Sequence, residues 1–367
     1  MAGPASPHSL EHLAQRYRNY VRPADYLAFG RVLRHLRDRT AQLKLDPART
    51  VVFELADPRI DREHGRYAFG LVKEFIAGGW SALLAKSFWY LSSMERKRHK
   101  RLLLKEPVGL FETPPSQQLE LLVTDREPSP LRAHFRRTIL LDYDSRLGDG
   151  RDLPRFPYRP HPEFDAEPDL GDEGRTYRVA FLGHWNREHY DDERDLAQFG
   201  VMTRWRMIQT LLNTLPPEDV HIVRGSEPAP DSARFLLSAD EDLPDLATYR
   251  RLLRRSDFFL ACPGTGFPLC HNLIESMLMG CIPIVQRPEL TGLSLVSGKS
   301  CLGFDGARSL LNTIGECSSM ATSRICRMRE RLRKEVMDGL APGGALAWLK
   351  NGFPEDRRPL SMFWFER

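Results

Sequence analysis

A glycine loop and a glutamate stand at a spacing that could hold a sugar nucleotide. The loop Pro263-Gly264-Thr265-Gly266 follows a short apolar run and precedes an apolar stretch with helical spacing. Glycines let backbone approach a ligand closely, and the free N–H groups at a helix start attract phosphate. Glu275 falls well inside the expected helix, too far from that phosphate. Its carboxylate suits the paired hydroxyls of a ribose, so loop and glutamate predict a nucleotide-sugar site.

The elements that would position these groups form a strand–loop–helix–strand unit. Phe258–Ala261 has the pattern of a buried strand, Leu269–Met279 that of a helix, and Ile282–Val285 that of the next strand. His271 and Asn272, which lie between the loop and Glu275, complete the candidate donor-binding residues of this unit. The alternative is an ordinary Rossmann-like unit in which the glutamate is a solvated helix residue.

This stretch resembles the C-terminal half of GT-B glycosyltransferases, most closely the exostosin-like family (glycosyltransferase family 47-like). The resemblance rests on Pro263, Gly264, Glu275 and Gly280-Cys281-Ile282-Pro283. The family usually has Ser and Arg before the glutamate, where this chain has Cys270 and Asn272.

The resemblance implies an α/β protein of two Rossmann-like domains facing a cleft. It also implies transfer of a sugar, with inversion, from a donor such as a UDP-sugar or GDP-sugar to an acceptor hydroxyl. The acceptor is expected to be a glycan, a lipid-linked molecule or a small molecule, with bacterial surface polysaccharide or glycan synthesis as the setting. Two alternatives stay open: a nucleotide-sugar epimerase on a GT-B fold, and a non-catalytic GT-B-like scaffold.

The composition is that of an ordinary globular protein. The chain has 367 residues, 41% hydrophobic and 28% charged, which suffices for two domains with separate cores. The formal charge of +4 does not demand a nucleic-acid partner. The sequence has neither a run of eighteen apolar residues nor a signal-peptide core, so a cytoplasmic protein is expected. The basic run Glu95–Arg101 is expected on a solvated face, with peripheral contact at the inner membrane face as the alternative.

The sequence does not call for a metal ion. The six cysteines include no C-x-x-C pair, which disfavours a zinc site. Cys262 and Cys281 stand in apolar strand contexts and are expected to be buried thiols. The one D-x-D element considered, Asp142-Tyr143-Asp144, lies in the presumed acceptor domain. No cofactor beyond the donor is therefore required, and Mg²⁺ stays an open alternative.

The first half of the chain opens as a βαβ unit. Thr50–Leu55 has the pattern of a strand, Arg66–Ala77 that of a helix, and Ser81–Phe88 that of a second strand. Such a unit favours a parallel sheet, and open α/β sheets bind ligands beyond the carboxyl ends of their strands. The polar loop after the first strand is therefore expected to face the acceptor.

That loop carries the candidate catalytic base. An inverting transferase needs a group to take the proton of the acceptor hydroxyl. Asp57, Asp61 and His64 are the main candidates, with Glu63 between them. A histidine has the most suitable ordinary pKa, and a carboxylate would also serve. The alternative is a solvated polar loop with Asp57 as a helix cap.

The second half offers further phosphate-binding candidates. Gly183 and Arg187 follow the expected strand Tyr177–Leu182, and Arg224 follows the expected strand Val220–Val223. A glycine permits close approach and an arginine could clamp a phosphate; for Arg224 the alternative is a surface ion pair. Pro228–Asp245 is expected to be a loop whose apolar patch, Phe235-Leu236-Leu237, could cover the donor.

These expectations divide the chain into five parts. They are an N-terminal helical extension (1–47), an acceptor domain (48–144), a linker (145–174), a nucleotide-sugar domain (175–340) and a segment returning to the first domain (341–367).

Overall fold

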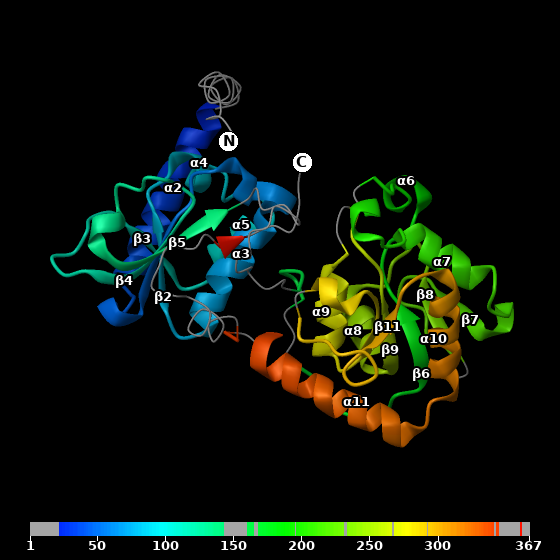
Figure 1. The fold of residues 1–367 in the computed structure, drawn as a ribbon. Coiled ribbons are helices and arrows are strands. Elements are labelled where there is room, and N and C mark those ends of the chain that lie inside the picture. The colour runs from blue at the N-terminus through cyan, green and yellow to red at the C-terminus, as the bar shows by residue number, and fades with distance from the viewer. Residues whose placement is uncertain are drawn as a thin grey trace, which may run out of the picture. The chain divides into compact units, whose positions relative to one another are not determined.

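The computed structural model describes residues 22–142, 160–164, 168–194, 196–230, 233–265, 268–291, 293–340, 343–344 and 360–361. The chain divides into two compact units, Met1–Leu141 and Asp142–Arg367. Each unit contains one sheet of parallel strands with helices packed on it (Figure 1). The predicted α/β class with two Rossmann-like domains is confirmed. The predicted domain boundaries and the cleft between the domains stay predictions.

The sheet of the first unit has the strand order of a Rossmann fold. Its strands are β1 (Thr50–Glu54), β2 (Ser81–Ala85), β3 (Val108–Phe111), β4 (Leu119–Thr124) and β5 (Phe135–Asp142). Within the unit they follow the order β5-β4-β1-β2-β3, and neighbouring strands run parallel. The order reverses between β1 and β4, so the loop after β1 leaves the sheet at the switch point where such sheets bind ligands.

Four α-helices belong to the described part of this unit: α2 (Pro23–Thr40), α3 (Arg62–Ala77), α4 (Phe88–Ser92) and α5 (Lys100–Leu103). Short 3₁₀ turns are η1 (Pro47–Arg49), η2 (Pro58–Asp61) and η3 (Arg132–His134). α3 covers β1 through an edge-to-face contact of Phe53 and Phe75, whose ring centroids are 5.5 Å apart. α2 packs beside β3, and Gly109 permits this approach. A Cβ at Gly109 would lie only 2.7 Å from the Thr40 hydroxyl.

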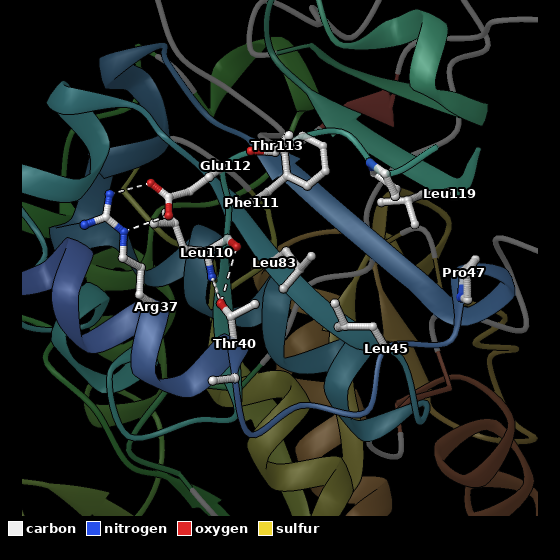
Figure 2. Close-up of a pocket in the computed structure, with 12 residues that line it drawn as sticks. Arg37, Thr40, Leu45, Pro47, Leu83, Leu110, Phe111, Glu112, Thr113 and Leu119 are labelled. Carbon is white, nitrogen blue, oxygen red and sulfur yellow. Dashed lines mark hydrogen bonds and ion pairs between the residues drawn. The ribbon is translucent and has the colours of Figure 1, made fainter. Parts of the chain in front are cut away.

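A hollow of about 510 Å³ lies between the end of α2 and strands β2 and β3 (Figure 2). Its floor is apolar and includes Leu83, Leu110 and Phe111. At its rim, Arg37 donates two hydrogen bonds to the Glu112 carboxylate, at 2.6 and 2.7 Å. Thr40 hydrogen-bonds the backbone of Leu110. The Arg37–Glu112 pair and the Thr40 hydroxyl are thus satisfied within the protein.

In the sheet of the second unit, the direction in which successive strands are added also reverses once. Its strands are β6 (Tyr177–Phe181), β7 (Val220–Val223), β8 (Phe235–Ser238), β9 (Ser256–Ala261), β10 (Ile282–Gln286) and β11 (Leu302–Phe304). They follow the order β11-β10-β9-β6-β8-β7, again parallel. The switch point lies between β6 and β9.

One loop prediction in this unit is wrong. Phe235-Leu236-Leu237 does not cover a ligand, because these residues belong to β8, which pairs with both β6 and β7. Phe235 and Leu237 are 2% and 0% exposed. A four-residue strand buried on both faces is only a short apolar run in the sequence, which periodicity cannot distinguish from a patch in a loop.

The helices of the second unit are α6 (Arg187–Tyr190), α7 (Arg204–Leu212), α8 (Leu246–Arg254), α9 (His271–Leu278), α10 (Ala307–Ser319) and α11 (Thr322–Glu335). Shorter elements are η4 (Ala197–Phe199), η5 (Pro217–Asp219), η6 (Pro288–Thr291), the π-helical turn η7 (Val336–Leu340) and the two-residue strand β12 (Leu360–Ser361). α9 packs on β9 and β10 (Figure 1). Among the described helices, none has the length and apolarity needed to cross a bilayer.

Candidate functional site

The loops after β6 and β9 meet because these strands are neighbours. Val179 is paired with Phe258, and Ala180 with Phe259. Beyond the end of β6, the Gly183 N–H donates to the Ser238 hydroxyl at 2.8 Å, and that hydroxyl donates to the Gly183 carbonyl. A Cβ at Gly183 would lie 3.5 Å from the Asn272 amide nitrogen. The structure therefore brings Gly183 together with the first turn of α9.

The start of α9 has unused capacity for polar contacts. Its N-cap is Cys270, whose side chain makes no capping hydrogen bond. The first N–H groups of a helix have no partner within the helix and attract negative charge. Asn272 is 3% exposed, and its amide oxygen has no hydrogen-bond partner in the described part of the chain. A buried amide oxygen without a hydrogen-bond partner is costly, which points to a polar ligand at this place.

Arg204, the first residue of α7, holds the loop between β9 and α9 by hydrogen bonds to its backbone. Arg204 is 3% exposed. Its Nε and Nη2 donate to the Pro263 carbonyl at 3.0 and 2.7 Å, and its Nη1 donates to the His184 carbonyl at 2.7 Å. Nη2 also lies 3.3 Å from the Cys270 sulfur. No sequence pattern indicated this residue, because in the sequence it is only a polar residue at a helix start.

The remaining members of the predicted loop differ in exposure. Pro263 is buried, Gly264 half-buried and Thr265 exposed. Gly266 lies outside the described residues. The predicted order of strand, loop, helix and strand is confirmed, and Cys262 and Cys281 are buried free thiols as expected. Burial raises the pKa of Cys262 to about 12 and that of Cys281 to about 11.

Glu275 is buried inside the second unit, with 2% of its surface exposed. Its Oε1 accepts hydrogen bonds from the His161 backbone N–H and from the His271 ring, both at 2.8 Å. Its Oε2 accepts one from the Tyr249 hydroxyl at 2.8 Å. Burial by itself would raise the pKa of Glu275, but neighbouring His271 and the other donors lower it to about 2. The alternative of a solvated helix residue is wrong.

The capacity of this carboxylate for further hydrogen bonds is limited. Each carboxylate oxygen has two acceptor positions, so Oε1 is filled and Oε2 keeps one. The segment that covers Oε1 belongs to the predicted linker, whose Phe164 is 4% exposed and packs edge-to-face on Tyr249 at 6.0 Å. This part of the linker is a component of the second unit, which no local sequence pattern indicated.

The two arginines predicted to clamp phosphate lie at different places in the second unit, one at the start of α6 and the other after β7. The Arg187 side chain is 75% exposed at the start of α6 and pairs with Asp191 at 3.3 Å. Arg224 is exposed and follows β7, the edge strand. Because β8 lies between β7 and β6, Arg224 leaves the sheet two strand spacings from Gly183, roughly 10 Å. Their phosphate-binding roles stay predictions.

In the first unit, the three candidate bases have different surroundings. Asp57 pairs with Arg59 at 2.7 Å. Asp61 accepts from the Lys100 ammonium at 2.7 Å and from the Ser93 hydroxyl at 3.1 Å. His64 is exposed and has a left-handed backbone with φ 59°. Both carboxylates are thus paired with a cation: Asp57 with Arg59, two residues along the chain, and Asp61 with the buried Lys100.

Lys100 is a second buried cation that the sequence analysis overlooked. It is 0% exposed and its ammonium lies 3.7 Å from the Tyr90 ring centroid. Burial lowers the pKa of Lys100 to about 8, against the attraction of Asp61. The predicted solvated face of Glu95–Arg101 is therefore wrong for Lys100 and for His99, which is 5% exposed. The Lys100 side chain packs closely against Gly65, where a Cβ would lie 2.2 Å from Lys100 Cγ.

Within the described ranges, no cluster of three or more His, Cys, Asp or Glu side chains is arranged to hold a metal ion.

Comparisons with known proteins give structural likeness at low identity. No protein-family model matches the chain, and no curated protein matches its sequence. Among solved structures, a glycosyltransferase from Rickettsia africae is 10% identical with a TM-score of 0.45, covering 83% of this chain and 97% of the other. HepE of Anabaena, in complex with UDP, is 11% identical with a TM-score of 0.46, covering 83% and 100%. An alpha-glucosyltransferase in complex with UDP and DNA is 10% identical with a TM-score of 0.44, covering 83% and 98%. The assignment of a function depends on this chain's own residues.

Proposed function

We propose that this protein is a glycosyltransferase of the GT-B type, related to the exostosin-like family, that transfers a sugar from a nucleotide-sugar donor to an acceptor hydroxyl. One observation carries the proposal. At the switch point of the second sheet, a helix start without a capping side chain and the unpartnered amide oxygen of Asn272 meet beside Gly183. Helix starts at such switch points bind phosphate groups.

In this proposal the donor diphosphate binds at the start of α9, against Gly264, Thr265, Gly266 and Asn272. Arg187 and Arg224 add positive charge toward the phosphates. The ribose takes the acceptor position that remains on Glu275 Oε2, next to His271. Positive charge around the diphosphate stabilises it as it leaves. The donor would be a UDP-sugar or GDP-sugar, and no metal ion is assigned a role.

The acceptor would bind at the switch point of the first sheet, where the loop after β1 carries the candidate bases. One of Asp57, Asp61 and His64 takes the hydroxyl proton as the oxygen attacks the anomeric carbon, which gives inversion. We propose a glycan, lipid-linked or small-molecule acceptor in bacterial surface polysaccharide or glycan synthesis. The site of action would be the cytoplasm or the inner membrane face.

A second candidate function is a non-catalytic scaffold on the same fold. The observation that favours it is that three of the four acceptor positions of the Glu275 carboxylate are already used by hydrogen bonds within the protein. A scaffold of this kind would keep the glutamate to hold the linker segment and would bind no nucleotide.

Calorimetry of the intact chain with UDP, GDP, ADP and CMP separates the two functions. A transferase binds at least one of these nucleotides, and a scaffold binds none. An epimerase would bind a UDP-sugar and convert it with no acceptor present, so an assay with donor alone identifies that case.

The variant Asn272→Asp tests the location of the site. A carboxylate in place of the buried amide would repel the diphosphate, so we expect the Kd of the nucleotide that binds best to rise about tenfold or more. Asn213→Asp, which changes an exposed residue at the end of α7, is the matched control and should leave the Kd unchanged. Equal affinity in the Asn272→Asp variant would contradict the proposed location.

A further inference from the structure

Arg204 connects three separate pieces of the second unit. The guanidinium bonds the His184 carbonyl in the loop after β6 and the Pro263 carbonyl in the loop after β9. It also contacts the sulfur of Cys270, which stands at the N-cap position of α9. A planar guanidinium with donors in fixed directions sets the relative positions of its partners. The two loops and the start of α9 are therefore held in one arrangement by one side chain.

The positive charge of Arg204 has no counter-charge in the described residues. Its partners are two backbone carbonyls, a thiol and the ring of Tyr190, whose centroid lies 4.0 Å from the guanidinium carbon. Arg329 in the same unit is equally buried, at 1% exposed, and there the guanidinium pairs with the carboxylates of Asp257 and Asp172. Buried charges are normally paired. Arg204 therefore lacks the paired anion that a buried guanidinium such as that of Arg329 normally has.

The place where an anion would offset this charge is the start of α9. Arg204 reaches Cys270 at the N-cap, and a Cβ at Gly183 would lie 3.9 Å from its Nη1. The helix start, the Asn272 amide and the Arg204 charge converge on this region. Because Nη1, Nη2 and Nε are already engaged with backbone carbonyls, Arg204 acts mainly by holding the loops and by its charge.

We infer that Arg204 is the positioning residue of the donor site: it fixes the loops after β6 and β9 against α9 and provides the buried positive charge that the donor's diphosphate balances. This inference rests on the proposed function and extends it, because it assigns the diphosphate part of the ligand to one side chain. The nucleoside part would not depend on Arg204.

The test compares UDP with uridine, which lacks the phosphates, by calorimetry on the intact chain. In Arg204→Met we expect the Kd for UDP to rise about tenfold or more, the usual scale for loss of charge-assisted contacts. The Kd for uridine should stay within about twofold, because no charged contact to the nucleoside is lost. Arg206→Met is the control: Arg206 lies two residues further along α7, with a side chain 58% exposed, and pairs with Asp191 at 3.7 Å. It should leave both constants unchanged.

A second variant covers the case in which Arg204→Met does not fold. Arg204→Lys keeps the buried charge but cannot bond both carbonyls with the same geometry, so its preference for UDP over uridine should lie between those of wild type and Arg204→Met. Equal weakening of UDP and uridine in Arg204→Met, or a full wild-type preference in Arg204→Lys, would overturn the inference alone. A wild-type protein that binds UDP no better than uridine would remove the proposed diphosphate site itself, and the inference with it.

Discussion

Glu275 is a carboxylate that the protein keeps ionised by surrounding it with donors. It sits in α9 with 2% of its surface exposed, and its partners come from α9 itself, from α8 and from the segment before β6. Removing a single partner from a buried ionic cluster is costly, because it leaves the other groups unsatisfied. The residue therefore stabilises the second unit, and one of its acceptor positions remains for the ribose of the proposed donor.

Glu275→Gln is expected to lower the free energy of unfolding at pH 7 by roughly 3 kcal/mol. Since the folded pKa of Glu275 is about 2, below the ordinary value of 4.5, its stabilisation is fully present above pH 4.5. It is lost as the pH falls toward 2, because the unfolded state then binds the proton more tightly. Urea unfolding of wild type and variant between pH 7 and pH 3 measures this difference. A gap that stays constant over this range would show that the carboxylate charge has no such role.

At the residue scale, the sequence indicated those site residues that belong to a local pattern. Gly183, Pro263, Gly264 and Asn272 were predicted because each follows a strand or opens a helix. The structure brings Gly183 and Asn272 together, and the binding roles of these residues stay predictions. Arg204 could not be found, since its partners His184 and Pro263 lie 20 and 59 positions away in the chain. The same holds for the Lys100–Asp61 pair, 39 positions apart. Such contacts are made only by the tertiary fold.

At the element scale, α9 is the helix on which the account depends. It has a thiol at its N-cap where a Ser, Thr, Asp or Asn would normally satisfy the first N–H groups. A helix that leaves its N-cap without a capping side chain is available to an external anion. Gly280 and Cys281, which follow α9 and belong to the stretch that resembles the exostosin-like family, have a packing role. A Cβ at Gly280, whose φ is 73°, would lie 2.4 Å from an Arg175 nitrogen, and Cys281 is 0% exposed. This part of the motif is explained by packing.

Cys270→Asp should change stability and binding in opposite directions. An aspartate at this position would cap α9 and would pair with Arg204, so we expect the free energy of unfolding to rise by about 1 kcal/mol. The same carboxylate would occupy the place of the donor phosphates, so the affinity for UDP should fall. Cys270→Ala, which adds no charge, is the control for loss of the thiol. Tighter UDP binding by Cys270→Asp would show that the anion site lies elsewhere.

The sequence predicted most of the longer elements and overlooked several of the short ones. The helices α3 and α9 and the strands β1, β6, β7 and β9 were found within a few residues of their bounds. In contrast, β3, β8 and β11 have only three or four residues, too few to show a period. The identity of β8 matters for function, because its position between β6 and β7 separates Arg224 from Gly183.

At the scale of the whole molecule, the described residues form two units, each with one sheet of parallel strands. In each sheet the direction in which successive strands are added reverses once. In each sheet the switch point carries the residues proposed to bind a ligand: the loop after β1 in the first unit, and the loops after β6 and β9 in the second. The α/β class followed from alternating strand and helix patterns. Pairing order did not, because it depends on contacts between strands far apart in sequence.

The most direct test of the donor site is hydrogen exchange of the intact protein with and without saturating UDP or GDP, followed by mass spectrometry. The account predicts slower exchange in peptides that cover residues 183–187 and 262–273, where backbone N–H groups would bind the diphosphate. The exposed loop 126–132 of the first unit serves as an internal reference. Protection confined to the first unit, or bound nucleotide with no change in either of the two predicted segments, would contradict it.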